Sequence, residues 1–358
     1  MYKYYFLLSR LLLNKTFSLK LFLNVSIIIS VTVCSLVIPL TLSISNGFKA
    51  NVENKIVNFD GFARIYNDDL NQKEKKYLLD NYSTSINSFS EKELIVRNNN
   101  ISEGVTYAEI ANINHLNEFL IHSYNDTDSG IYIGLQLHDK LFPYNESSNK
   151  SLFLIQDSEN IYKKKVGGIF ETGISLYDKH TIIEKNNNIN PQGFILNKQD
   201  YINITNTLNI YGFTFKERYY TFIKWLDSYS LPINLLLFFI VLISLLNNSF
   251  CFNMDVINRQ NDIKILYTLG FSKKSILELL FLKYSILNVF GFFIGSICCF
   301  LFLTIESNYK FIKLPGNIYF SSSLPISLKL INFLYVPCLL LINIIYKRIR
   351  LRRQLYEI

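Results

Sequence analysis

Long uncharged runs alternate with polar stretches along this chain. The uncharged runs are 21–48, 231–254, 284–305 and 330–346. A bilayer core about 30 Å thick requires about 20 apolar residues in a helix that rises about 1.5 Å per residue, and the first three runs satisfy this. The last run has 17 residues between Lys329 and Lys347, whose side chains can extend to the membrane surface. The pattern predicts one membrane helix, a large polar domain, and then three membrane helices.

The distribution of charge assigns a side of the membrane to each polar segment. The segments 1–20, 251–275 and 346–358 together carry 13 basic and three acidic residues, whereas the rest of the chain has a net charge of −2. The positive-inside rule therefore places both termini and the 251–275 loop in the cytoplasm. With four spans, the 49–230 domain and the 306–329 loop lie outside. The overall charge of +8 is a topology signal, so no nucleic acid is expected as a partner.

We therefore predict an α-helical membrane protein with four transmembrane helices (one plus three) and a large α+β extracytoplasmic domain between helices 1 and 2. Short β-rich pieces that alternate with Asn-rich turns indicate the α+β class. These pieces are 62–66, 93–96, 130–133, 151–155, 165–170 and 194–196. The expected parts are a cytoplasmic interfacial helix 1–20, transmembrane helix 1 at 21–48, the external domain with helical stalks 49–230, transmembrane helix 2 at 231–252, a coupling helix 253–274, transmembrane helix 3 at 276–305, an external loop 306–328, transmembrane helix 4 at 329–346, and a basic tail 347–358.

Sequence patterns that mark enzymes and nucleotide sites are missing. There is no HExxH, GxSxG or GxxxxGK[ST], and His115, His122, His138 and His180 form no Cys/His cluster. All five cysteines lie in or at the ends of apolar runs, so the external domain folds without disulfides. We expect a non-catalytic membrane subunit that binds no cofactor or metal.

The segment after the second apolar run predicts a short amphipathic helix followed by a sharp break. Its apolar residues at near-helical spacing are Ile257, Ile263, Leu266 and Leu269. Gly270 suits a helix C-terminus, and Ser272 can cap the next helix; Ser275 with Glu278 offers an alternative capping box. Two interpretations fit: a passive loop on the inner membrane surface, or a rigid lever that a cytoplasmic partner moves.

At these residues the chain resembles the FtsX/MacB-type permeases of ABC systems and, within them, the lipoprotein-releasing LolC/LolE family. The family's coupling segment reads roughly R-x-x-E-I-A-I-L-R-A-L-G-A-S, and residues 259–272 read RQNDIKILYTLGFS here, with Asp262 in place of Glu. Four further patches match in the same order along the chain. They are 43–65, 130–142, 166–183 and 311–328.

Two segments depart from the family pattern. The C-terminal stretch IIYKRIRLRRQLYEI lacks the family's prolines. The stretch 154–165 is shorter than the hairpin with which LolC-type members hold their soluble acceptor. The resemblance therefore leaves open whether this chain or its partner docks the carrier.

The resemblance implies a permease subunit in the bacterial inner membrane, with both termini cytoplasmic and the large domain periplasmic. Its partners would be an ABC ATPase subunit that uses ATP and Mg²⁺, a second permease copy or related chain, membrane lipid, a lipoprotein substrate and a periplasmic lipoprotein carrier. ATPase-coupling residues would be Arg259, Asp262, Ile263, Leu266, Leu269, Gly270 and Lys273. A stalk hinge after helix 1 would comprise Asn46, Gly47 and Phe48. Gly291 and Gly295 form a GxxxG motif for close helix packing, either within a subunit or between subunits.

Two alternatives remain. One is an FtsX/MacB-type permease for peptide efflux or for control of a periplasmic hydrolase, which would use the same coupling segment. The patches at 166–183 and 311–328 favour lipoprotein release over this alternative. The other is a membrane-anchored extracytoplasmic sensor. A sensor would need a cytoplasmic output domain, yet no predicted cytoplasmic segment is longer than 251–275.

Overall fold

The computed structural model describes most of the chain between residues 19 and 337. The described residues are 19–82, 85–98, 101–124, 130–143, 151–156, 160–315, 320–321, 323–335 and 337. They form two compact units, each described by itself below. Unit 1 comprises Met1–Phe48, Leu226–Ile312 and Leu324–Ile358, and unit 2 comprises Lys49–Trp225 and Lys313–Ser323. The predicted interfacial helix 1–20, apart from its last two residues, and the basic tail 347–358 lie outside the described residues.

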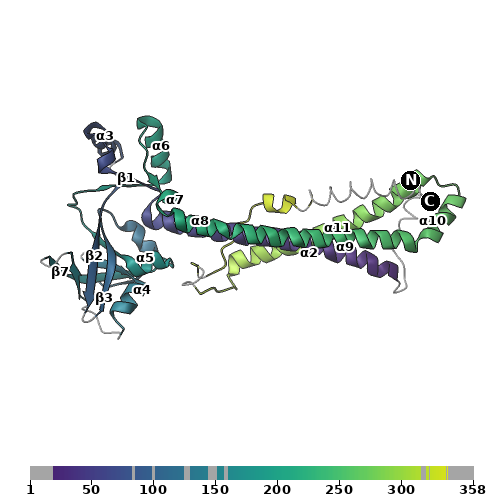
Figure 1. Cartoon of the computed structure of the whole chain (residues 1–358), viewed down its shortest axis with the longest axis horizontal. Helices are drawn as coiled ribbons and strands as arrows, with labels where there is room; N and C mark the ends of the chain where they lie inside the picture. Colours follow the sequence, from purple (N-terminus) through teal and green to yellow (C-terminus); the bar gives the residue numbers. More distant parts are fainter. Residues whose placement is uncertain are drawn as a thin grey trace. The chain divides into compact units, whose positions relative to one another are not determined.

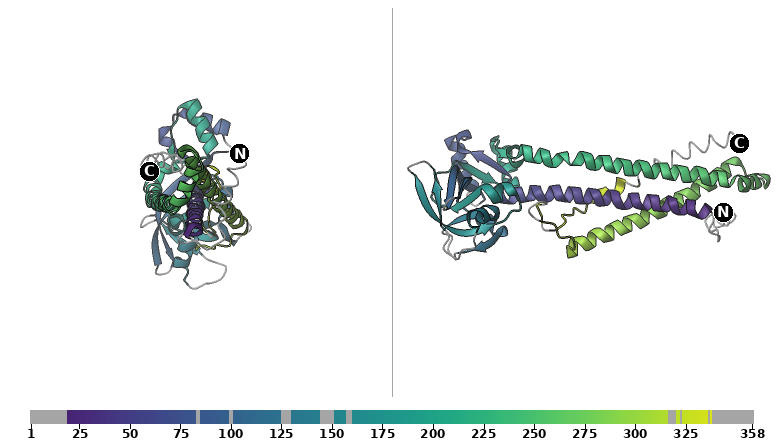
Figure 2. Two further views of the ribbon diagram at one scale, coloured as in Figure 1. Left: turned by 90° about the vertical axis from the view of Figure 1, so that its right-hand side faces the viewer. Right: turned by 60° about the horizontal axis from the view of Figure 1, so that its bottom comes forward.

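Unit 1 is built from long apolar helices that run side by side (Figures 1 and 2). Its helices are α2 (Leu19–Asp60, which continues into unit 2), α9 (Ser230–Asn258), α10 (Gln260–Thr268) and α11 (Lys273–Tyr309). Within the described part of the chain, three helical stretches are long and apolar enough to cross a membrane: Leu21–Asp60, Tyr220–Asn258 and Lys274–Tyr309. The fourth predicted span, 329–346, is described only at 329–335 and 337, where 331–335 are helical.

Unit 2 is a mixed sheet with short helices. Its strands are β1 (Ala63–Tyr66), β2 (Asn87–Asn98), β3 (Ile101–Ile110), β4 (Leu120–Ser123), β5 (Ile131–Gly134), β6 (Ser151–Ile155), β7 (Ile161–Phe170), β8 (Thr181–Lys185), β9 (Gly193–Leu196) and β10 (Phe213–Thr214). Among the described residues the strand order is β10-β1-β9-β2-β3-β8-β5-β7-β4. β3 with β8 and β5 with β7 are parallel, and the other neighbours are antiparallel. The structure therefore contains the α+β domain that the sequence predicts.

One strand closes part of this sheet into a ring. β6 pairs with both β2 and β7, so β2, β3, β8, β5, β7 and β6 form a closed circuit of six strands. Alternate side chains of these strands point inward, as the period of two in a strand requires. The enclosed core includes Val96, Ile131, Ile133, Leu152 and Leu154, each at most 1% exposed. Closure removes free strand edges from this part of the domain.

The helices of unit 2 flank the sheet at different places. They are α3 (Gln72–Tyr82), α4 (Leu135–Leu141), α5 (Ser175–His180), α6 (Lys198–Leu208), α7 (Phe215–Arg218) and α8 (Tyr220–Ser228), with short 3₁₀ turns η1 (Asn67–Asp69) and η2 (Asn114–Glu118). α4 adds Leu137 and Leu141 to the core of the ring. α3 and α6 lie beside β1 and bury Leu78 and Ile204 in a second, smaller core (Figure 1).

The described strands include all six predicted β-rich pieces, although β2 and β7 are longer than predicted. The patch 166–183 consists of the end of β7, then α5, then the start of β8, and β5 lies between the two strands. Asp178 on α5 is buried and accepts bonds from the Thr172 amide at 2.8 Å and the Gly173 amide at 2.9 Å. These bonds give the Thr-Gly and Asp of this patch a structural role.

Candidate functional site: the coupling segment and its helices

The coupling segment, residues 253–274, forms the end of α9, the short helix α10 and the turn into α11. Arg259 separates α9 from α10 with the backbone angles φ −106° and ψ 9°. Gly270 follows α10 in the left-handed region at φ +88°, and its amide donates to the Tyr267 carbonyl at 3.0 Å. Ser272 then caps α11, because its hydroxyl accepts a bond from the Ser275 amide at 3.2 Å. The break at Gly270 and the cap at Ser272 lie where local sequence signals predict them, but the helix is shorter than the predicted 253–274, because α9 continues to Asn258 and Arg259 interrupts the helix before α10.

A buried carboxylate ties this segment to α11. Asp255, near the end of α9, is fully buried and accepts bonds from Arg259 Nε at 2.8 Å, Lys283 Nζ at 2.6 Å and Tyr284 Oη at 2.7 Å. Lys283 and Tyr284 belong to α11 and are 0% and 2% exposed. Buried charges persist in proteins when they are paired and hydrogen-bonded. We call these four residues the Asp255 cluster; it joins the end of α9, the Arg259 junction and α11.

The predicted coupling residues have different surroundings. Arg259 is buried in the Asp255 cluster, and Ile263 and Leu266 are half-buried. The exposed residues among the predicted coupling residues are Asp262, Leu269 and Gly270. Lys273 is the first residue of α11. α10, which the structure describes in full, has no buried side chain, so its own packing contributes little to holding it.

Sequence reasoning missed Asp255 and Lys283 as members of one site. They lie 28 positions apart, and only the contact between α9 and α11 brings them together. The available signal was that each is an ionisable residue at the edge of an apolar run. Such residues on membrane helices usually pair with one another or face a functional interior.

The two glycines of the GxxxG motif pack against α2 of the same chain. Thr32 on α2 donates its hydroxyl to the Gly291 carbonyl at 3.1 Å. A Cβ at Gly291 would lie 2.8 Å from the Ile28 carbonyl oxygen, and one at Gly295 would overlap Ser35 and the Thr32 carbonyl. The motif therefore serves close approach of α11 and α2 within one subunit.

α2 and α9 border a groove of about 430 Å³. Its apolar lining includes Ile29 and Ile243, and its polar atoms come from serine and asparagine side chains that link the two helices. Ser30 and Ser244 share a hydroxyl–hydroxyl bond of 2.8 Å, and the Asn247 amide lies 3.3 Å from the Ser26 hydroxyl. These polar groups satisfy one another, which leaves an apolar surface along the groove.

The predicted hinge at Asn46, Gly47 and Phe48 is not a break in the helix. α2 is continuous through these residues to Asp60. Gly47 instead permits the chain near Pro325 to approach, because a Cβ there would overlap the Pro325 carbonyl. The Ser327 amide donates to the Ser43 carbonyl at 3.1 Å beside it. The glycine thus serves packing of the segment around Pro325 against α2.

Comparisons with known proteins bear on the identity of these parts. Residues 234–354 match the FtsX-like permease C-terminal family. The chain is 25% identical over 337 residues to "Lipoprotein-releasing system transmembrane protein LolC" of Buchnera aphidicola subsp. Schizaphis graminum (strain Sg), over 83% of this chain and 82% of that protein. It is also similar to the extracellular domain of the noncanonic ABC-type transporter YknZ from Gram-positive bacteria, with 9% identity, a TM-score of 0.26, and coverage of 45% of this chain and 87% of that one. That last similarity is too low to support an argument.

The apolar helices and the permease-domain match define a membrane-spanning permease of the ABC type. The chain is similar to FtsX/LolC-type permeases: residues 234–354 match the permease domain, and the similarity to LolC extends along most of its length. The resemblance found from the sequence is therefore confirmed at the level of the family.

Proposed function

We propose that the chain is the permease subunit of an ATP-driven inner-membrane complex that extracts lipoproteins from the outer leaflet and releases them to a periplasmic carrier. In this proposal both termini are cytoplasmic and unit 2 is periplasmic. The similarity to a lipoprotein-releasing protein over 83% of the chain supports the choice of substrate. The observation that carries the proposal is the geometry of α10: it is bordered by Arg259 of the Asp255 cluster on one side and by the capped start of α11 on the other.

The exposed surface of α10 suits a partner chain. Ile265 and Tyr267 are each 57% exposed, and Leu269 just beyond the helix is 69% exposed. Exposed apolar side chains grouped on a short helix are typical of a protein contact. The ATPase subunit would dock here and would itself bind ATP and Mg²⁺. Because the Asp255 cluster joins α9 to α11, movement of α10 would shift both helices together.

The groove between α2 and α9 suits an acyl chain. Its lining is mainly apolar, and its serine and asparagine groups bond to one another. Extracting lipid costs about 0.8 kcal/mol per buried CH₂, so one long acyl chain costs on the order of 10 kcal/mol. This cost explains a requirement for ATP hydrolysis. A second permease copy or a related chain would cover the open side of the groove.

The test is purification of the complex from its own membranes in mild detergent, followed by reconstitution with a lipoprotein and a soluble acceptor. We expect an ATPase and a second permease to copurify, and ATP to drive release of the lipoprotein. Ile265→Asp should abolish release while the chain still inserts, and Asn261→Asp, also on α10 and exposed, should retain it. If no ATPase copurifies under conditions where a known complex survives, the sensor alternative takes precedence.

A further inference from the structure

Asp60, the last residue of α2, joins three parts of unit 2. It is 5% exposed and accepts bonds from Arg64 on β1, from Arg218 at the end of α7, and from the Tyr219 hydroxyl at 2.6 Å. Arg218 also donates to the Asp60 backbone carbonyl at 3.5 Å. Tyr219 directly precedes α8, which leads to α9 through Tyr229. One carboxylate thus binds the end of α2 and the α7–α8 segment, which are two of the segments by which the chain passes between unit 2 and the apolar helices.

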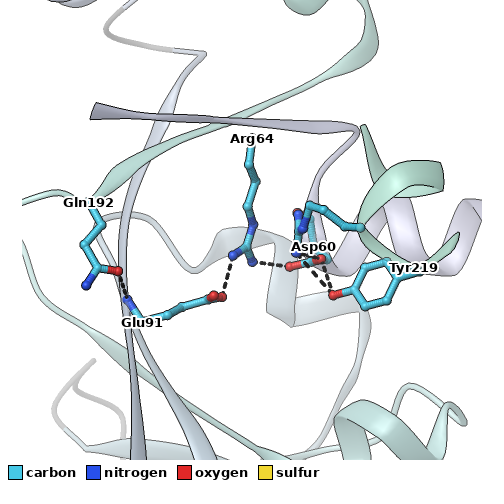
Figure 3. A network of polar contacts seen from close by, with 6 residues as sticks. Asp60, Arg64, Glu91, Gln192 and Tyr219 are labelled. Atoms are coloured by element: carbon cyan, nitrogen blue, oxygen red, sulfur yellow. Dashed lines mark hydrogen bonds and ion pairs between the residues drawn. The ribbon is translucent and has the colours of Figure 1, made fainter. Parts of the chain in front are cut away.

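Arg64 extends this contact into the sheet. Figure 3 shows Arg64 between the carboxylates of Asp60 and Glu91. Its Nη1 donates to Glu91 Oε1 at 2.5 Å, and its guanidinium lies 4.4 Å from the centre of the Phe89 ring. The Glu91 amide, on β2, donates to Gln192 Oε1 at 2.9 Å. Burial lowers the pKa of Arg64, but the carboxylates of Asp60 and Glu91 together raise it by a larger amount. The net effect is a raised pKa, so the guanidinium stays charged.

The end of α2 is also held on its other side. Lys55 Nζ donates to the Thr172 carbonyl at 2.6 Å. Phe59 packs against Phe170, with ring centres 5.2 Å apart, and against Tyr177, with ring centres 4.4 Å apart. These contacts involve α2 but not α7 or α8. The Asp60 side chain accepts bonds from Arg218 and Tyr219, so it connects this helix end directly to the α7–α8 segment, whose Phe215 amide also donates to the Phe62 carbonyl at 2.9 Å.

Stability alone is a weak explanation for this arrangement. Removing a buried ion pair from water costs about as much as the pairing returns, and well-packed apolar residues often stabilise a protein equally well. What a buried carboxylate with several donors provides is a defined orientation of the groups around it. Burial and the nearby Asp60 also raise the pKa of Tyr219, so its hydroxyl remains a donor at neutral pH.

We propose that Asp60 is a positioning residue that locks the end of α2 and the α7–α8 segment to strand β2, so that movement of either segment reaches the sheet. The source of that movement, a nucleotide cycle in a partner ATPase, rests on the function proposed above. The direct consequence is local: a change of nucleotide state alters the environment of Glu91, and loss of the Asp60 carboxylate abolishes that response.

The test measures hydrogen exchange of β2 peptides (Asn87–Asn98) in the complete complex with its ATPase, in lipid nanodiscs, with an ATP analogue and with ADP. The wild type should show a nucleotide-dependent difference, and Asp60→Asn should lose it. Asp80→Asn makes the same chemical change at an exposed carboxylate on α3 and should keep the difference. The proposal is overturned if Asp60→Asn responds like the wild type, or if the wild type itself shows no response.

A cross-link separates positioning from a general loss of structure. Ala63 and Thr214 are partners in the β1–β10 pair, a spacing that a disulfide can bridge. In the Asp60→Asn background, oxidised Ala63→Cys/Thr214→Cys should restore the exchange difference, and reduction should remove it again. A cross-linked complex that stays unresponsive contradicts the proposal.

The cargo is tested separately, by lipoprotein released per ATP hydrolysed in the same preparations. A wild type that shows the exchange difference but releases no lipoprotein refutes the proposed substrate and leaves the role of Asp60 standing. A wild type that releases lipoprotein, with Asp60→Asn equally efficient per ATP, refutes the role of Asp60 and leaves the proposed function standing.

Discussion

Replacing Asp255 by asparagine should destabilise unit 1 more than replacing the lysine that it contacts. Asp255 accepts three bonds of 2.6 to 2.8 Å, from Arg259, Lys283 and Tyr284. Asp255→Asn removes the anion that two buried cations face, a change that costs about 3–5 kcal/mol in buried pairs. Lys283→Met keeps an apolar chain of similar length and leaves the carboxylate its bonds to Arg259 and Tyr284. Lys283→Met should lower the free energy of unfolding by roughly 1.5–3 kcal/mol, which is the contribution of one charged hydrogen bond.

The double variant distinguishes this interaction from a general loss of packing. The double variant Asp255→Asn/Lys283→Met removes both charges. Its loss of unfolding free energy should therefore be smaller than the sum of the two single losses, by about 2 kcal/mol. Whole domains are stable by only about 5–15 kcal/mol, so each of these changes is measurable. The assay is SDS-induced unfolding of the purified chain in mixed micelles, followed by helical circular dichroism.

The control is Glu278→Gln, which also replaces a carboxylate by an amide but at an exposed position of α11, and which should alter the unfolding free energy by less than about 0.5 kcal/mol. Strictly additive effects of the two cluster variants would refute the reasoning. So would an Asp255→Asn variant that unfolds like the control, because the structure assigns that carboxylate three donors and no exposure.

Three further changes test other contacts. Gly295→Leu should cost about 1–3 kcal/mol or prevent folding, because a Cβ there overlaps Ser35, and the same unfolding assay measures it. Gly270→Pro should disrupt the turn after α10, because φ +88° and the donated amide are incompatible with proline, and ATP-driven release should fall while ATPase activity persists. Asp178→Asn should destabilise unit 2 by about 1.5–3 kcal/mol, because it weakens the bonds from the Thr172 and Gly173 amides, and proteolysis of unit 2 should become faster.

Local determinants explain what the sequence could predict. The helix break at Gly270 and the cap at Ser272 depend on residues within one turn of each other, and both lie where predicted. The predicted β-rich pieces also correspond to strands in the structure. β3 was missed: Gly104 and polar residues interrupt its apolar alternation, and its identity as a strand depends on pairing with β2 and β8. Such pairing joins distant segments, which single-sequence patterns do not encode.

The polar clusters were beyond prediction for the same reason. Asp255 and Lys283 come together only when α9 and α11 pack, and Asp60 meets Arg218 across 158 positions. The hinge at Asn46, Gly47 and Phe48 was expected from the resemblance of 43–65 to the family's segment after the first membrane helix. The structure instead shows close approach of a neighbouring backbone at Gly47, within an unbroken helix.

The contrast between α10 and its neighbours bears on how force could pass through unit 1. A helix with many buried side chains resists displacement by its own packing, whereas α10 has no buried side chain along its length, all of which the structure describes. Its position therefore depends on its ends, at Arg259 and at the Gly270–Ser272 turn. From there the Asp255 cluster reaches α11, and α11 contacts α2 at Gly291 and Gly295 without intervening side chains. This contiguity specifies where to look: weakening the Asp255 cluster should uncouple α9 from α11, whereas cutting the α2 contact at Gly295 should leave α9, α10 and α11 moving together.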